Sequence, residues 1–256
     1  MTTTEADAKQ DVDSTQDVCI VGAGPAGLTA GLFTARAGLE TLIVNAGEPI
    51  LRRNAHLENV PGFPAGVNSR LFLDMLSDQV ERNGGKLTEV EVTNVTKSED
   101  GQFAVMTADE RAIQSDYVIC ASWAESNYVA DIDEIGLMKR GSKTYIDAND
   151  DGETGVDGLY VTGRLAGEPH QTVVASGHGA KVALSVIHDS DVPFYNDWVA
   201  PEGYFTGRGR EVPPGCEEID EEERQRREQQ SLKVMQEYFE SPHPESPTQH
   251  PSVREE

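Results

Sequence analysis

Cysteine is scarce in this chain of 256 residues, and its three positions, Cys19, Cys120 and Cys216, have no paired spacing. Cys19 and Cys120 fall in predicted strands, where cysteine behaves as a small buried apolar residue. Cys216 precedes a predicted helix, whose dipole would lower the thiol pKa, but the acidic residues after it would raise that pKa again. No other catalytic residue is evident. Cys216 is therefore the candidate redox residue, and it would need a thiol partner on another molecule.

Basic residues are also few, because 21 Lys and Arg stand against 45 Asp and Glu and leave a formal net charge of −24. Nucleic acid and anionic membranes would repel such a surface, so neither is an expected partner. The balance resembles that of proteins from a salt-loaded cytoplasm, where molar salt screens charges over about 3 Å. The sequence therefore predicts a halophilic source and loss of the fold in dilute buffer.

Long apolar runs are missing as well. No stretch is long enough to cross a membrane and the N-terminus has no apolar signal-peptide region, which predicts a cytoplasmic protein. The histidines are scattered without metal-ligand spacing, so we expect no metal site. Neither a Ser-His-Asp arrangement nor a pair of carboxylates points to hydrolysis.

The clearest motif that the chain does contain is DVCIVGAGPAGLTA, at residues 17–30. A short apolar run precedes Gly22, Gly24 and Gly27, and Pro25 and Ala26 begin a helix-forming segment. The three glycines permit a tight turn from strand to helix, close approach of a pyrophosphate, and close packing of the helix on the strand. The helix N-terminus offers free N–H groups to the phosphates. The motif predicts a dinucleotide site in a βαβ unit.

The second predicted strand, residues 41–44, is followed by Asn45 instead of the acid that usually holds the ribose hydroxyls. Asn45 can still hydrogen-bond a hydroxyl, and Gly47 and Glu48 follow closely. The first motif alone therefore leaves both FAD and NAD open as the ligand.

A second segment distinguishes FAD from NAD. Residues 156–187 read as a strand ending at Gly163, a polar loop, and a small-residue helix that begins near Gln171. Together with the first motif, this segment resembles the two halves of the FAD domain in thioredoxin reductases and related flavin-dependent disulfide reductases. The resemblance implies FAD, with the helix dipole at Gln171 and Thr172 favouring negative charge on the flavin ring.

Further positions fit the same resemblance. The turn ENVPGFP at residues 58–64 is similar to a flavin-flanking turn, Glu91 and Val92 fall where the adenine is held, and YVICAS at 117–122 closes the first half. His170 stands where the family carries arginine. The cofactor-binding residues implied are Gly22, Gly24, Pro25, Ala26, Asn45, Gly47, Glu48, Asn54, Asn59, Glu91, Val92, Ala121, Gly163, Arg164, His170, Gln171 and Thr172.

The chain departs from the family in two respects. Residues 121–157 contain no second GxGxxG and no CxxC, and they leave little room beyond one βαβ unit of about 30 residues. The NADPH-binding domain is therefore expected to be missing. Arg164 replaces the aspartate that the family has after Gly163. It either pairs with the pyrophosphate or is a solvated loop residue of a decayed site.

The expected fold class is α/β, with a Rossmann-like FAD-binding domain that combines a parallel sheet and a small antiparallel β-meander, followed by a C-terminal helical tail. The termini are polar and rich in Pro, Ser or Thr, which predicts disorder. The predicted parts are a disordered segment at 1–16, the FAD domain at 17–200 in two segments of about 17–122 and 123–190, a Gly/Pro/Arg loop with a charged helix at 201–240, and a disordered tail at 241–256.

Two functions remain open at this point. The first is a thioredoxin reductase-like, FAD-dependent oxidoreductase that is reduced by a redox partner protein or a small molecule instead of by its own NADPH domain. The second is a non-catalytic FAD-binding module, either a sensor or a subunit of a larger redox assembly. NAD(H) bound in the first glycine-rich loop is a third possibility. The resemblance also implies a homodimer.

Overall fold

A seven-stranded sheet forms the centre of the computed structural model, which describes residues 14–123, 125–141, 143–250 and 253. The strand order is β3-β2-β1-β6-β5-β4, and β9 pairs with β6 outside this path. The strands of this sheet are β1 (Ser14–Val21), β2 (Thr41–Asn45), β3 (Lys86–Glu89), β4 (Val92–Lys97), β5 (Phe103–Thr107), β6 (Ala112–Cys120) and β9 (Leu159–Val161).

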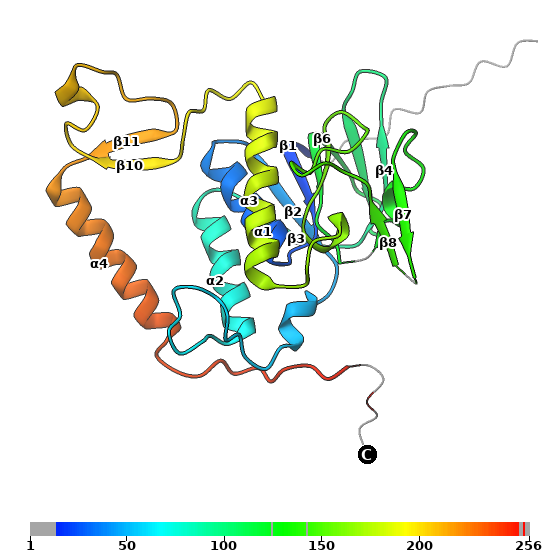
Figure 1. Ribbon diagram of the computed structural model, residues 1–256, viewed down its shortest axis with the longest axis horizontal. Coiled ribbons are helices and arrows are strands. Elements are labelled where there is room, and N and C mark those ends of the chain that lie inside the picture. The colour runs from blue at the N-terminus through cyan, green and yellow to red at the C-terminus, as the bar shows by residue number, and fades with distance from the viewer. Residues whose placement is uncertain (1–13, 124, 142, 251–252, 254–256) are drawn as a thin grey trace, which may run out of the picture.

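The sheet combines two kinds of pairing. The strands β3, β2, β1, β6 and β9 pair in parallel, whereas β4, β5 and β6 form an antiparallel meander (Figure 1). On β1 and β6, Val18, Ile20, Val118 and Ile119 are fully buried, as expected for parallel strands covered on both faces. The predicted α/β class, with a parallel sheet and a small meander, is confirmed.

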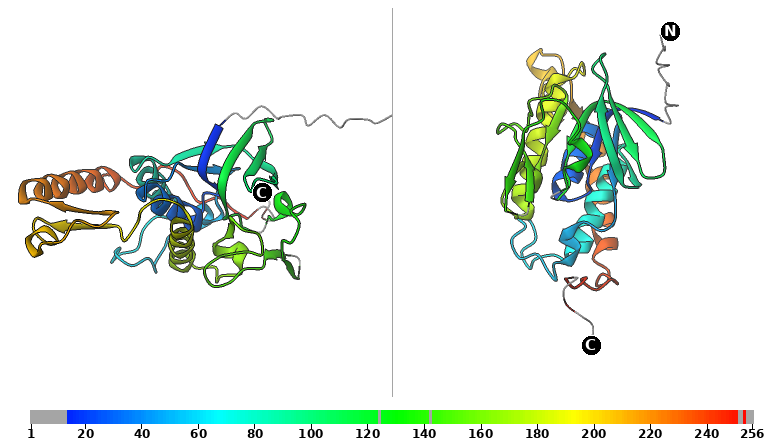
Figure 2. Two further views of the ribbon diagram at one scale, coloured as in Figure 1. Left: turned by 90° about the horizontal axis from the view of Figure 1, so that it is seen from above. Right: turned by 90° about the vertical axis from the view of Figure 1, so that its right-hand side faces the viewer.

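Three helices cover one face of the sheet (Figures 1 and 2). They are α1 (Pro25–Arg36), α2 (Ser69–Arg82) and α3 (Thr172–Asp189). Pro25 stands in the first turn of α1, and the side chain of Asn68 caps α2 by accepting from the backbone N–H of Arg70 at 2.9 Å. A Cβ on Gly179 of α3 would lie 2.2 Å from the carbonyl oxygen of Ala26, so glycine is required where α3 meets α1. This contact joins segments that are far apart in sequence.

The connection from β6 to β9 covers the opposite face. It contains η2 (Asn127–Val129) and an antiparallel ribbon of β7 (Leu137–Arg140) and β8 (Lys143–Ile146). Tyr128 and Ile146 from this connection are buried in a second apolar core together with Cys120 and Val161 from the sheet. The described part of the connection therefore completes the core of the same domain.

The first strand begins earlier than the sequence suggests. Ser14, Thr15 and Gln16 pair in parallel with residues 113–115 of β6. The prediction of disorder over residues 1–16 is therefore wrong for these three, and residues 1–13 lie outside the described residues. The ladder is made by backbone groups, so a polar composition did not prevent the strand from extending.

Residues 194–239 form an arm that extends from the domain (Figures 1 and 2). The predicted C-terminal helix is confirmed as α4, with the side chain of Asp220 accepting from the N–H of Glu223 at 2.8 Å. The parallel pair β10–β11 was not predicted. The elements of the arm are β10 (Trp198–Pro201), η4 (Thr206–Arg208), β11 (Cys216–Ile219) and α4 (Glu221–Tyr238).

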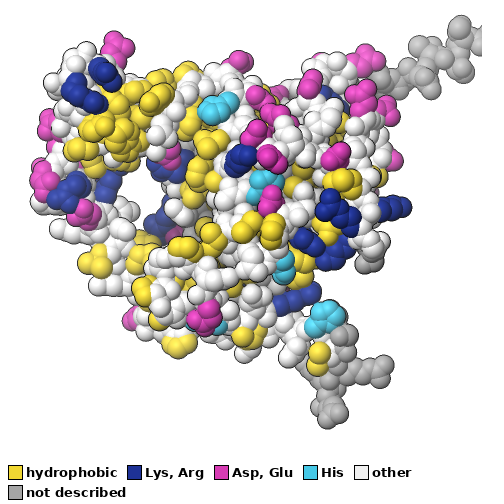
Figure 3. All heavy atoms as spheres, viewed as in Figure 1, with side chains coloured by type: hydrophobic (Ala, Val, Ile, Leu, Met, Phe, Trp, Pro, Cys, Tyr) yellow, Lys and Arg dark blue, Asp and Glu magenta, His cyan; other side chains and the backbone are white. Residues whose placement is uncertain are grey.

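The arm contacts the domain at its two ends, and an opening lies between (Figure 3). At one end Arg36 donates to both carboxylate oxygens of Asp197. At the other, the hydroxyl of Tyr238 donates to Asp78 at 2.7 Å, and the ring of Phe239 lies 6.3 Å from that of Phe63. No residue of α4 is buried.

The segment after α4, for which the sequence predicts disorder, makes specific contacts with the domain. His243 contacts Asp74 of α2, and Glu245 contacts Arg52 of η1 (Ile50–Arg53); the side chain of His243 is only 7% exposed. Low apolar content predicts disorder where no partner exists, but polar side chains of this segment find specific partners on the domain. Residues 251, 252 and 254–256 lie outside the described residues.

Candidate cofactor site

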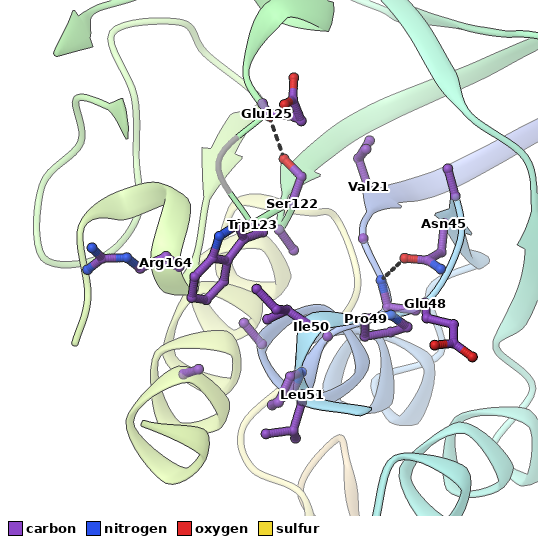
Figure 4. A pocket seen from close by; sticks show the side chains of 18 of the residues that line it. Val21, Asn45, Glu48, Pro49, Ile50, Leu51, Ser122, Trp123, Glu125 and Arg164 are labelled. Carbon is purple, nitrogen blue, oxygen red and sulfur yellow. Dashed lines mark hydrogen bonds between the residues drawn. The ribbon is translucent and has the colours of Figure 1, made fainter. Parts of the chain in front are cut away.

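A cavity of about 810 Å³ lies at the carboxyl ends of β1, β2 and β6. In a doubly wound sheet, ligands bind at this edge where the strand order reverses, and here β1 has β2 on one side and β6 on the other. The volume is within the range of about 300–1,000 Å³ that is typical of small-molecule sites. Residues 21–26 and 169–172 line it together, so both sequence motifs meet at one place (Figure 4).

The three glycines of the first motif have different surroundings. A Cβ on Gly22, which has a φ of +116°, would lie 2.7 Å from the carbonyl oxygen of Ala121, and one on Gly27 would lie 1.9 Å from that of Gly22. A Cβ on Gly24 would meet no atom within 4 Å. The packing of the turn and of α1 therefore requires glycine at positions 22 and 27, whereas Gly24 faces open space in the cavity. No side chain caps the N-terminus of α1 there, which leaves it available to an anion.

Asn45 connects the glycine-rich turn to the loop after β2. Its Oδ1 accepts from the N–H of Ala23 at 3.0 Å, and its Nδ2 donates to the carbonyl of Gly47 at 2.6 Å (Figure 4). Both ends of the amide are thus used within the protein. Glu48 also lines the cavity and is the nearest carboxylate after the strand. Asn45 therefore braces the loop after β2, and Glu48 places a carboxylate on the cavity wall.

At the other end of the cavity, α3 begins beside the turn at residues 58–64. The Nδ2 of Asn59 donates to Oε1 of Gln171 at 2.8 Å, which links two segments that the resemblance places around a flavin. Gln171 precedes α3 and no side chain caps that helix. The N-terminus of α3 therefore presents unbonded backbone N–H groups and a partial positive charge to the cavity.

Arg164 lies in the cavity wall but points away from Val21 and Asn45 (Figure 4). Its guanidinium donates to the hydroxyl of Tyr145 at 2.8 Å and to the carbonyl of Glu168 at 3.1 Å. Arg164 was expected either to pair with the pyrophosphate or to be a solvated loop residue. Its guanidinium lies away from the glycine-rich turn and is hydrogen-bonded within the protein, so it matches neither expectation. It packs with aromatic rings at the α3 end of the cavity.

Trp123 was missed by the sequence analysis, although the chain contains only two tryptophans. Its ring lies 4.2 Å from that of His170 in an edge-to-face contact, and Lys143 lies 5.1 Å from the ring centre. Burial and the nearby charges of Arg164 and Lys143 lower the pKa of His170. These residues make the α3 end of the cavity aromatic and positively charged.

Most of the predicted cofactor residues line this cavity, and four do not. Asn54 and Asn59 line a neighbouring cavity of about 380 Å³. Gly163 lies behind the wall, where a Cβ would be 2.7 Å from that of Ala26 and where its N–H donates to Nδ1 of His178 at 3.0 Å. Gly47 holds the loop after β2 through its carbonyl. The predicted residues on the main cavity are Gly22, Gly24, Pro25, Ala26, Asn45, Glu48, Glu91, Val92, Ala121, Arg164, His170, Gln171 and Thr172.

None of the three cysteines lines the cavity. Cys19 and Cys120 are fully buried, and burial raises the pKa of both thiols to about 12. Cys216 is partly exposed on β11 of the arm, where its thiol donates to the carbonyl of Asn196 at 3.3 Å. The structure therefore does not bring the candidate redox residue to the candidate cofactor.

Thiol labelling is expected to separate these cysteines. At pH 8 a small maleimide should modify one thiol per folded chain, at Cys216, because the other two are buried and protonated. All three should react in denaturant. Mass spectrometry gives the count, and Cys216→Ser is the control, expected to leave the folded chain unlabelled. Rapid labelling of Cys19 or Cys120 in the folded chain would contradict the burial described here.

No group of three or more His, Cys, Asp or Glu side chains is arranged to hold a metal ion within the described ranges. In the same part of the chain, no helix has the length and apolar character needed to cross a bilayer.

Comparison with known protein families gives two matches. The family model described as FAD binding domain matches residues 15–54, and the model described as pyridine nucleotide-disulphide oxidoreductase matches residues 69–179. The first match covers the glycine-rich motif and the loop after β2. The second extends into α3.

Similar proteins are named thioredoxin reductase. That of Listeria monocytogenes is 34% identical over 127 residues, which are 49% of this chain and 39% of that protein. That of Aquifex aeolicus is 34% identical over 117 residues, which are 45% of this chain and 36% of that protein. The chain therefore spans well under half the length of these relatives.

Solved structures share the fold. A thioredoxin reductase from Gloeobacter violaceus has a TM-score of 0.59 at 16% identity, covering 71% of this chain and 99% of that one. A ferredoxin-flavin thioredoxin reductase from Clostridium acetobutylicum has a TM-score of 0.56 at 16% identity, covering 69% and 98%. The sequence matches, the fold and the cavity agree with one another. In its sequence matches and in its fold, the chain is similar to thioredoxin reductases, which are FAD-dependent oxidoreductases.

Proposed function

We propose that this chain binds FAD in the 810 Å³ cavity and acts as an oxidoreductase whose electrons come from a partner protein or a small molecule. The observation that carries the proposal is the contrast among the three glycines, since only Gly24 has open space where its side chain would be. A diphosphate can approach the backbone there, at the uncapped N-terminus of α1.

The remaining residues fit the rest of the cofactor. Glu48 would hold the ribose hydroxyls, and Glu91 and Val92 would lie along the adenine. The N-terminus of α3, at Gln171 and Thr172, would face the flavin ring and favour negative charge on its pyrimidine edge. When bound, FAD would supply reversible two-electron chemistry.

The protein's own groups shape the environment of the ring. Trp123 and His170 would exclude water from one side of the ring site, and the lowered pKa of His170 keeps its imidazole neutral near neutral pH. Arg164 and Lys143 would hold positive charge at the same end. These groups favour an anionic ring and an anionic donor or acceptor over cationic ones.

The similarity to thioredoxin reductases and to the pyridine nucleotide-disulphide oxidoreductase model favours an oxidoreductase over a non-catalytic FAD module. We further propose that the working form is a homodimer, which light scattering of the purified protein in molar KCl would measure. The electron donor is external in this proposal, because the described connection from β6 to β9 contains only η2 and the β7–β8 ribbon.

The direct test is the visible spectrum of protein incubated with FAD and passed through a desalting column. The flavin absorbance should remain with the protein, bleach with a reductant and return with an acceptor. A colourless protein contradicts FAD binding, and bound NAD(H) would also give no visible colour. A flavin that cannot be reduced supports the non-catalytic module instead.

Replacing Gly24 with valine is expected to lower FAD affinity about 100-fold, or about 3 kcal/mol, because the new side chain occupies the approach of the diphosphate. The apo fold should be unaffected, since a Cβ there meets no atom within 4 Å and the φ of −77° suits any residue. Gly207→Val on the arm is the matched control, because Gly207 is equally open but outside the cavity. Titration of each variant with FAD measures the effect; equal affinities would contradict the assignment.

A further inference from the structure

The C-terminal segment approaches the candidate cofactor cavity in a series of specific contacts. After α4, Nε2 of His243 lies 2.9 Å from Oδ2 of Asp74 on α2. The N–H of Glu245 donates to Nδ1 of His243 at 3.1 Å, so the ring proton is on Nε2 and is donated to Asp74. The imidazole is thus fixed at both nitrogens, with only 7% of the side chain exposed.

The next contacts carry the segment toward the glycine-rich end. The carboxylate of Glu245 pairs with the guanidinium of Arg52 on η1, which also donates to Asp74 at 2.9 Å. The hydroxyl of Thr248 then donates to Oε2 of Glu48 at 3.2 Å. Two residues later, His250 is part of the cavity wall.

These contacts follow one direction, from α2 through η1 to the loop after β2. Glu48, Glu91 and Val92 define the adenosine end of the cavity in the proposed function, so the segment meets the cavity at that end. Exposed ion pairs alone contribute little to stability, but several partners held in sequence by one short segment act together. His243, whose side chain is only 7% exposed, fixes the base of the segment, and Thr248 and His250 fix its far end.

We propose that residues 241–250 form a strap that closes the adenosine end of the cofactor cavity and slows release of the dinucleotide. Thr248 orients the Glu48 carboxylate toward the ribose position, and His250 supplies a wall to the adenosine. This inference rests on the proposed binding of FAD. It adds to that proposal a structural role for a segment whose composition predicted disorder.

The test uses the full chain with three strap substitutions together, Glu245→Gln, Thr248→Val and His250→Ala. FAD release after dilution, followed by the rise in flavin fluorescence, is expected to be about tenfold faster than in the unmodified chain, as for the loss of one to two hydrogen bonds. Ser246→Ala is the matched control, because Ser246 is exposed on the same segment, and its release rate should not change.

A second readout does not depend on release or activity. Hydrogen exchange of the peptide covering residues 241–250 should slow when FAD is added to the unmodified chain and should respond less in the strap variant. The melting temperatures of the two apo proteins should agree, which separates a role at the cavity from a general loss of stability. If the unmodified chain retains FAD but the variant releases it at the same rate, the strap is wrong and the proposed function stands. If the unmodified chain does not retain FAD, the result contradicts both the strap and the proposed function.

Discussion

Replacing Gly27 with alanine is expected to lower the free energy of unfolding by about 4 kcal/mol, a large fraction of the about 5–15 kcal/mol that stabilises a typical domain. The added Cβ would lie 1.9 Å from the carbonyl oxygen of Gly22 and 3.1 Å from the Cβ of Ala121. The first of these atoms belongs to the backbone of the turn and cannot move aside as a side chain can. Helix α1 would have to shift away from β1, and α3 packs on the same helix.

Urea denaturation of the apo protein measures this loss. The Gly24→Val variant is the comparison, because it alters the same turn at a position with open space and should keep the stability of the unmodified chain. Gly27→Ala should also lose FAD, since it displaces the N-terminus of α1. Similar unfolding curves for all three proteins would show that the close approach of α1 to the glycine-rich turn is not needed for the fold.

Raising KCl from millimolar to molar concentration at pH 7 is expected to raise the melting temperature by about 10 °C, or about 3 kcal/mol for a chain of this size. The cause is the net charge of −24, whose self-repulsion opposes the compact state. At molar salt the screening length of about 3 Å removes most of that repulsion. Thermal melts monitored by circular dichroism provide the measurement, and this result would support the proposed halophilic source.

Melting curves over the same range of KCl at pH 4.5 are the control. The net charge is near zero at the sequence pI of about 4.5, so salt has little self-repulsion to screen there. Hydrogen bonds from Arg224 and Gln225 lower the pKa of Glu221 to about 2, and those from Arg226 and Arg227 lower that of Glu223 to about 2. Carboxylates with a lowered pKa add to the free energy of unfolding above about pH 4.5, and this stabilisation is lost as the pH falls toward 2. Their ion pairs therefore persist in the control. Melting curves at pH 7 that do not change with salt would contradict the prediction.

The sequence predicted the central part of the fold because each of its signals is local. The apolar run before Gly22 indicates a buried parallel strand, and the glycine spacing indicates the turn and the helix that follow. Predictions of disorder were less successful at both ends. Ser14, Thr15 and Gln16 extend β1 through backbone pairing, and residues 241–250 are held by polar contacts with distant residues, neither of which composition reveals.

In the candidate site too, residues in local motifs were predicted and residues placed by tertiary contacts were not. Gly22, Gly24 and Gln171 were found from motifs, and all three line the cavity. Trp123 and His250 also line it, but neither belongs to a motif. The position of Arg164 was not predicted either, because its direction depends on Tyr145, which contacts it from a separate strand.

The order of residues alone determined where a strand must turn tightly into a helix, since only glycine permits the positive φ of Gly22 and the contact at Gly27. It also determined the large negative charge, which requires no structure to count. Tertiary structure decided which distant segments close the cavity, because Asn59 meets Gln171 and Thr248 meets Glu48 across 112 and 200 positions of the chain. Such contacts depend on how the helices pack on the sheet, and no local pattern encodes that packing.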